Sequence, residues 1–145
     1  MNYIFFIILS LVIIAIPVQA IDTNTDGTAH PHGITSSGLN TVVDFNDNIF
    51  NITGGTQKEG NLFHSFEKFN LHTGEGALFN DYGIQNTIGR ITGADYSWIN
   101  GKIYSSAANL YLINPNGIMF GPNVSLNIAG SFYASTADYL RLRES

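Results

Sequence analysis

Apolar residues recur at every second position in short runs along much of the chain. Examples of this spacing are Val43 with Phe45, Phe50 with Ile52, and Phe69 with Leu71. Because side chains alternate between the two faces of an extended strand, a period of two predicts strands with one buried and one solvated face. Glycines separate the runs, at positions 54, 55, 60, 74, 76, 83, 89, 93 and 101. The pattern therefore predicts short strands joined by frequent turns.

The alternation is clearest between residues 109 and 132, where three apolar runs are separated by two polar breaks. The breaks are residues 114–117 (Asn-Pro-Asn-Gly) and 121–123 (Gly-Pro-Asn). In each break proline fixes φ for a turn and asparagine tolerates the neighbouring conformation, while Gly117 supplies the positive φ that other residues resist. This rhythm suits a coil of a β-solenoid, but a β-sandwich uses the same signals, so periodicity alone leaves both open.

The first segment of the chain has the pattern of a secretory signal peptide. Residues 3–16 are almost entirely apolar, and we expect cleavage between Ala20 and Ile21. The run is shorter than the roughly 20 residues of a comfortable transmembrane helix, although an uncleaved anchor is an alternative because the segment before it carries no Lys or Arg. We expect a signal peptide at 1–20, a polar lead-in at 21–33 and one all-β domain at 34–145.

Residues 135–143 are the one stretch that invites a helix. Ser135 or Thr136 would cap it, and Tyr139 and Leu140 are among its apolar positions. A stretch this short at the end of the sequence makes a poor isolated helix. We therefore expect a fraying turn or the start of another coil.

Composition narrows the classes of function. The 145 residues include 6 Lys plus Arg, 11 Asp plus Glu and no Cys, and the formal net charge is -5. Nucleic-acid affinity relies mainly on clustered cations, so we expect no nucleic-acid partner. The lack of Cys excludes disulfides, thiolate nucleophiles and Cys-ligated metals. A charged fraction of 12% beside 15 Gly suits a sheet protein whose polar face is Asn, Ser and Thr.

No motif points to catalysis, a cofactor or a metal. Of the four histidines, His30 and His32 lie in the polar lead-in and do not complete a metal site, and neither does His72. We interpret His64 as a polar residue on the exposed face of a strand. The oxygen-rich residues 44–48 lack the Gly and Glu of a calcium-binding EF-hand loop and predict a solvated turn. The chain also lacks a nucleophile elbow and a phosphate loop.

Three aromatic residues, Tyr96, Trp98 and Tyr104, allow two interpretations. If they are exposed, they would line a sugar-binding site. Aromatic side chains on strands more often belong to the core or to cross-strand pairs, and we favour that interpretation.

Three blocks of the sequence, in this order, have a distinctive pattern of residues: 61–71, 84–93 and 109–130. The most distinctive segment, here called the signature turn, consists of Asn114, Pro115, Asn116, Gly117 and Ile118. Together the blocks strongly resemble the filamentous haemagglutinin N-terminal domain, the two-partner secretion (TPS) domain of large exported bacterial exoproteins. The signature turn matches the second signature motif of that family residue for residue. The first motif, Asn-Pro-Asn-Leu, is absent, and residues 79–91 look like the shorter variant of members without it.

The resemblance implies a right-handed parallel β-helix, or β-solenoid, with capping strands. It also implies a route: Sec-dependent passage to the periplasm, recognition by the POTRA domains of an outer-membrane β-barrel transporter, and export to the surface of a Gram-negative-type bacterium. The resemblance also implies that the recognition determinants are Asn61, Leu62 and Phe63 and the signature turn, and we expect recognition to work by strand addition. The alternative for that turn is that Pro115 and Gly117 only shape a corner that the β-helix requires.

Family members are much longer than this chain, so we expect the domain to be truncated after Ser145. The leading hypothesis is the secretion domain of a haemagglutinin-like adhesin, which acts by binding and is not an enzyme. A free-standing carbohydrate-binding or haemagglutinating module is the alternative, and it would depend on an exposed aromatic such as Trp98. A β-helical polysaccharide-active enzyme ranks last, because residues 109–132 hold no converging carboxylates.

Overall fold

A computed structural model describes residue 12 and residues 22–141 of the chain. The predicted cleavage site, between Ala20 and Ile21, lies outside these residues. The described part contains thirteen β-strands and no helix, so no helix in it could span a membrane, and the predicted all-β class is confirmed. The strands are β1 (Ile34–Gly38), β2 (Thr41–Asn46), β3 (Ile49–Gly54), β4 (Thr56–Lys58), β5 (Asn61–Phe69), β6 (Gly76–Phe79), β7 (Asn86–Ile91), β8 (Ser97–Ile99), β9 (Lys102–Ser105), β10 (Asn109–Ile113), β11 (Ile118–Phe120), β12 (Ser125–Ile128) and β13 (Ser131–Ser135).

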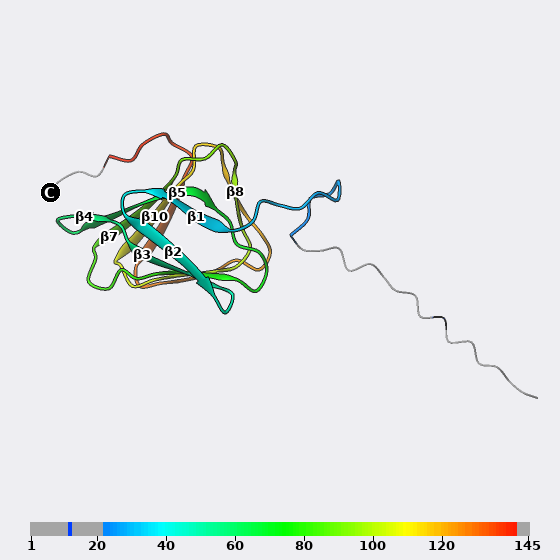
Figure 1. The fold of residues 1–145 in the computed structure, drawn as a ribbon, viewed down its shortest axis with the longest axis horizontal. Helices are drawn as coiled ribbons and strands as arrows, with labels where there is room; N and C mark the ends of the chain where they lie inside the picture. Colours follow the sequence, from blue (N-terminus) through cyan, green and yellow to red (C-terminus); the bar gives the residue numbers. More distant parts are fainter. Residues whose placement is uncertain (1–11, 13–21, 142–145) are drawn as a thin grey trace, which may run out of the picture.

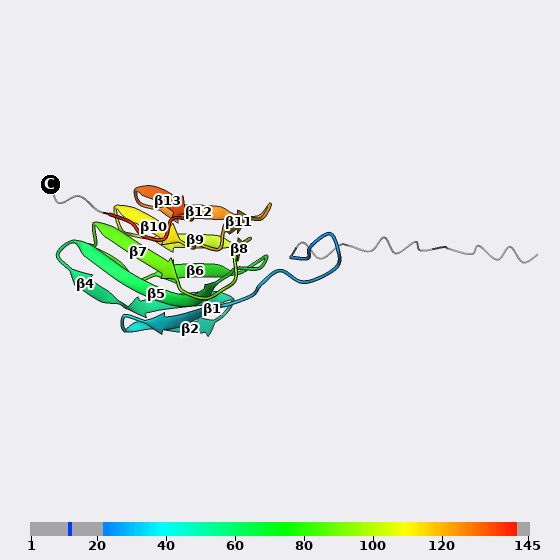
Figure 2. The same ribbon diagram turned by 90° about the horizontal axis from the view of Figure 1, so that it is seen from above.

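The strands wind into a β-solenoid with three parallel stacks (Figure 1 and Figure 2). The first sheet stacks β5, β7, β10 and β13, the second pairs β8 with β11, and the third stacks β3, β6, β9 and β12. Successive coils lie in register, so Asn61, Asn86, Asn109 and Ser131 follow one another across the first sheet. Parallel pairing between successive coils confirms the predicted β-solenoid and excludes the sandwich that periodicity left open.

Apolar side chains from the sheets fill the interior of the solenoid. Phe66, Phe69 and Phe79 are almost fully buried, with ring centroids between 5.2 and 6.3 Å apart. Aromatic pairs in this range add about 0.5–1.5 kcal/mol beyond the burial of their area. Gly89 lies against this cluster, and a Cβ there would approach Phe66 Cε2 to 3.0 Å and Leu112 Cδ1 to 3.3 Å. The close packing of the ring therefore favours glycine at this position.

Three antiparallel strands cap the N-terminal end of the solenoid. β1 and β4 both pair with β5 and cover the edge of the first sheet, while β2 pairs with β3 at the edge of the third. The turn between β2 and β3 places Asp47 and Asn48 at φ of 49° and 63°. Asp and Asn tolerate this region better than most residues, and both are exposed. The predicted solvated turn is thus confirmed at these two residues.

The opposite end of the solenoid is open. β11, β12 and β13 each pair with a single neighbour in the described part of the chain, and Figure 2 shows β12 and β13 at the outer edge of the stack. Phe120 and Leu126 stand in register with the buried Ile99 and Ile103, yet they are 44% and 45% exposed. They continue the interior stacks, so this end presents free strand edges around an apolar surface.

The interpretation of His64 as an exposed residue is wrong. The side chain is 1% exposed and points into the core beside Phe66 and Phe79. β5 carries apolar residues at both odd and even positions, so its sequence does not decide which face is buried. The structure buries Leu62 with His64 and leaves Phe63 on the outer face.

Candidate partner-recognition site

The signature turn is bound to the coil that precedes it. Asn114 is fully buried: its Nδ2 donates to the Asp95 carbonyl and the Ser97 hydroxyl, both at 3.0 Å, and its Oδ1 accepts the N–H of Asn116 at 3.0 Å. Gly117 has φ of 113° and donates its N–H to the Asn114 carbonyl at 3.0 Å. The side-chain amide of Asn114 is therefore hydrogen-bonded within the protein and stabilises this corner of the coil.

The remaining residues of the signature turn reach the surface to different extents. Pro115, Gly117 and Ile118 are half-buried, whereas Asn116 is exposed. Asn116 Nδ2 donates to the Gly93 carbonyl at 2.8 Å, in the corner of the preceding coil. Asn116 thus presents the most accessible side chain of the segment.

The first predicted segment lies at the start of β5, and its side chains divide between the core and the surface. Leu62 is buried, while Asn61 and Phe63 face outward and are half-buried. Asn61 begins a ladder of side-chain amides: Asn86 Nδ2 donates to Asn61 Oδ1 at 2.8 Å, and Asn109 Nδ2 donates to Asn86 Oδ1 at 2.9 Å. The ladder ties three successive coils together in register.

The structure does not bring the two predicted segments together. Asn61 is in register with Asn109 at the start of β10, whereas Asn114 follows the end of that strand. Five residues of extended strand span about 16 Å. A partner that contacts both segments must therefore extend along the strands of the first sheet.

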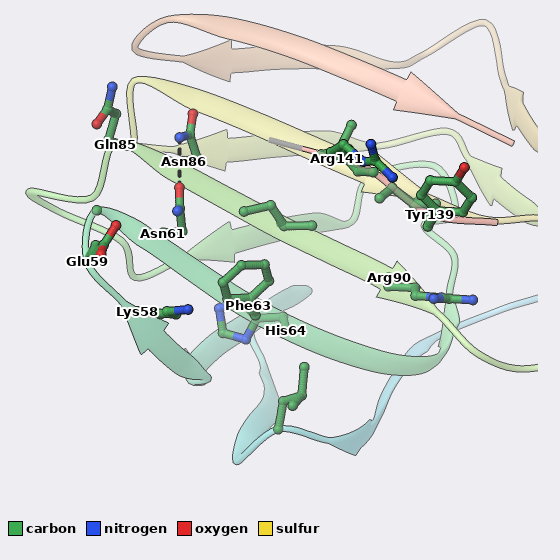
Figure 3. Close-up of a pocket in the computed structure, with 15 residues that line it drawn as sticks. Lys58, Glu59, Asn61, Phe63, His64, Gln85, Asn86, Arg90, Tyr139 and Arg141 are labelled. Carbon is green, nitrogen blue, oxygen red and sulfur yellow. Dashed lines mark hydrogen bonds between the residues drawn. The ribbon is translucent and has the colours of Figure 1, made fainter. Parts of the chain in front are cut away.

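A groove of about 820 Å³ lies on the outer side of the first sheet, between the start and the end of its strands (Figure 3). The β4–β5 hairpin lines it on one side and residues 139–141, which form no helix, line it on the other. Phe63 contributes to its apolar lining with Ile88 and Ile113, which are 5% and 3% exposed. Two of the predicted residues, Asn61 and Phe63, therefore border a concave surface.

The lead-in is fixed to the second sheet by Asp22. One carboxylate oxygen accepts hydrogen bonds from Trp98 Nε1 at 2.9 Å and Asn100 Nδ2 at 2.8 Å, and the other accepts the N–H of Thr73 at 2.9 Å. Partial burial opposes ionisation, but these hydrogen bonds outweigh it and lower the pKa of Asp22 to about 2. Asp22 is thus a charged anchor.

Histidines of the lead-in complete this attachment. The ring of His30 stacks on Trp98, with centroids 3.7 Å apart, and leaves Trp98 only 6% exposed. His32 Nε2 lies 2.6 Å from Glu75 Oε1. Trp98 therefore belongs to a packed interface, as favoured for the strand aromatics, and the exposed Trp98 that the sugar-binding alternative requires is absent. No group of three or more His, Cys, Asp or Glu within residues 22–141 is arranged to hold a metal ion.

Asp81 and His64 are among the polar side chains that are buried inside the solenoid. Asp81 accepts hydrogen bonds from the hydroxyls of Thr87 and Ser105 and from two backbone N–H groups, which satisfies its carboxylate. His64 Nδ1 lies 3.2 Å from Thr41 Oγ1, while its Nε2 has no hydrogen-bond partner in the described residues. Burial lowers the pKa of His64 to about 4, against the attraction of Asp81. Both residues therefore have a structural role inside the solenoid.

Comparison with known proteins adds a family assignment to this geometry. The model of a family described as the TPS secretion domain matches residues 31–145. A heme/hemopexin-binding protein of Haemophilus influenzae is 39% identical over 56 residues. That segment makes up 39% of this chain and 6% of the relative, so the chain spans a small part of the relative's length.

Proposed function

This chain belongs to the TPS secretion domain family, and we propose that it carries the export address of a two-partner secretion exoprotein. In this proposal residues 1–20 direct Sec-dependent passage and are cleaved between Ala20 and Ile21. The domain is then recognised in the periplasm by the POTRA domains of a cognate outer-membrane β-barrel transporter, and the exoprotein is exported to the cell surface. The observation that carries the proposal is the extent of the match, which includes every described strand.

The predicted determinants divide into contact residues and structural residues. Asn61 and Phe63 face outward from β5, and Asn116 is exposed at the signature turn, so these three are the proposed contacts. Leu62 and Asn114 are buried and act through the fold. β4 pairs only with β5 in the described part of the chain, which leaves a free edge beside Asn61 where a partner strand can add.

The activity beyond export is a separate proposal. We infer that the exoprotein is an adhesin or another surface binder and that this chain acts by binding, not by catalysis. The Haemophilus influenzae relative is named for heme and hemopexin binding, but the match covers 6% of it, so the likeness supports a shared export domain. The free-standing carbohydrate-binding module remains the alternative, without the exposed Trp98 on which we expected it to depend.

Export in cells with and without the transporter gene tests the proposed function. We expect the full chain to become accessible to external protease only when the transporter is present, and to stay in the periplasm when it is deleted. Phe63→Ala should reduce surface appearance, whereas Phe45→Ala, which removes an exposed ring from the capping strand β2, should not. Equal surface appearance in cells lacking every such transporter would refute the export role.

A further inference from the structure

The charges around the groove on the first sheet differ from those of the chain as a whole. The sequence has 11 acidic residues against 6 Lys plus Arg. Three of those six cations, Lys58, Arg90 and Arg141, line the groove, while Glu59 is its single acidic lining residue. Half of the cationic residues of an acidic chain therefore gather at one concave surface.

These cations have no ion-pair partner in the described part of the chain. The ion pair found within residues 22–141 joins His32 to Glu75, and no carboxylate in that part lies within 4.0 Å of the charged groups of Lys58, Arg90 or Arg141. Exposed cations that have no internal partner raise the local concentration of anionic ligands. The three cations therefore give the groove a positive charge, which attracts a negatively charged ligand.

The charged and apolar lining residues lie in a definite order along the groove. Lys58 lies on β4 at the end of the groove near Asn61, Arg90 lies on β7 toward the other end, and Arg141 lies beside Tyr139 on the segment that lines the opposite side (Figure 3). The apolar lining of Phe63, Ile88 and Ile113 comes from the three neighbouring strands. An extended segment with acidic residues at both ends and apolar residues between them matches this order.

We propose that the groove binds an extended acidic segment of the transporter, with aliphatic side chains over Phe63 and carboxylates at Lys58 and Arg90. The amides of the Asn61–Asn86 ladder border the path and can hydrogen-bond the backbone of the segment. This inference rests on the proposed export function and adds to it the chemistry of the bound segment. Aliphatic side chains dominate the apolar lining, which favours a peptide over a sugar.

Fluorescence anisotropy with a dye-labelled synthetic peptide tests the chemistry directly. The probe has a Leu–Val–Leu centre between pairs of Glu, and its counterpart carries Lys in place of Glu. We expect the full chain, recovered from the periplasm of cells lacking the transporter, to bind the Glu peptide and not the Lys peptide. Replacing Lys58, Arg90 and Arg141 with Gln should weaken binding about tenfold, because each exposed pair contributes modestly.

A matched variant controls for loss of charge. Lys68→Gln with Lys102→Gln removes cations that do not line the groove and should leave peptide binding unchanged. Equal binding of the Glu and Lys peptides, or of the parent and the triple variant, would overturn the proposal. Groove-dependent binding of polygalacturonate but not of the Glu peptide would also overturn it and assign the groove to acidic polysaccharide.

Export separates this inference from the proposed function. If surface appearance requires the transporter but the triple variant is exported and binds the transporter normally, the groove assignment fails while the export role stands. If surface appearance does not require a transporter, the export role itself fails. Reduced export of the triple variant together with normal export of the Lys68→Gln, Lys102→Gln control supports both.

Discussion

At the scale of single residues, asparagine supplies the corners that the solenoid needs. Asn114 combines a buried side-chain amide with three hydrogen bonds to the neighbouring corner and its own turn. Asn116, two positions later, is exposed and makes one bond to a carbonyl. The same residue type therefore has a structural role at one position and an accessible side chain at the other.

Asn114→Ala should lower the free energy of unfolding by about 2–3 kcal/mol, because it removes three hydrogen bonds and leaves buried groups without partners. Asn116→Ala serves as the control and should cost less than about 1 kcal/mol. Urea unfolding of the two variants beside the parent measures the difference. Equal destabilisation by both substitutions would contradict the assignment of Asn114 as the residue that holds the corner.

His64 makes stability depend on pH. Its pKa in the folded state is about 4, below the ordinary value of 6.5, so the unfolded chain binds the proton more readily. The free energy of unfolding is then highest above pH 6.5 and decreases by at most about 3 kcal/mol as the pH falls toward 4. Asp22, with a pKa of about 2, loses its contribution only below its ordinary value of 3.8.

Urea midpoints at pH 7 and pH 4.5 test the His64 effect. The parent should lose stability between the two, and His64→Leu should flatten the dependence because it removes the group that the unfolded chain protonates. An unchanged pH dependence in His64→Leu would show that other groups are responsible. The window lies above that of Asp22, so the two contributions separate.

The burial of His64 shows what the sequence could not decide at this scale. Leu62 and Phe66 share the parity of His64, whereas Phe63 has the other, and a period of two is satisfied by either choice. The outcome depends on a partner across the coil, because Phe79 of β6 packs against His64 and Phe66 on the even-numbered face of β5. The position of β6 relative to β5 cannot be predicted from local patterning.

At the scale of elements, turn chemistry made the last coil predictable. The breaks at 114–117 and 121–123 separate β10, β11 and β12, as expected from their Pro, Asn and Gly residues. The pairing directions of β1, β2 and β4 could not be predicted, since antiparallel caps and parallel coils use the same alternation. The attachment of the lead-in was also missed, because Asp22 and Trp98 are 76 positions apart.

The lead-in should detach when its anchor is removed. Asp22→Ala eliminates hydrogen bonds to Trp98, Asn100 and Thr73 and should cost about 2 kcal/mol, as expected for bonds to a charged group. Trp98 is the single tryptophan of the chain, so its emission should shift to longer wavelength as it becomes solvated. Asp26→Ala, at an exposed residue, is the control, and an unshifted emission in Asp22→Ala would contradict the anchoring role.

At the scale of the whole molecule, the two ends of the solenoid differ. Antiparallel strands close one end, while β11, β12 and β13 leave the other open in the described part of the chain. Exposed apolar side chains beside free strand edges promote association. Within residues 22–141, one end is therefore capped by antiparallel strands and the other exposes apolar side chains.

The polypeptide of residues 1–145, produced by itself, should self-associate through exposed apolar side chains such as Leu126 on β12. Leu126→Lys places a charge among the exposed apolar residues of the open end and should shift the sedimentation coefficient toward that of the monomer. Val42→Lys introduces the same charge at an exposed position of the capped end and should change nothing. Association that persists equally in both variants would place the contact elsewhere.

The central claim is that this domain is an export address read by a transporter, and direct binding tests it most simply. The measurement is the equilibrium binding of the full chain, recovered from the periplasm, to the isolated POTRA domains of its cognate transporter. The account predicts saturable binding that Phe63→Ala weakens and Phe45→Ala leaves intact. Absence of binding to the POTRA domains, with the solenoid shown to be folded, would contradict it.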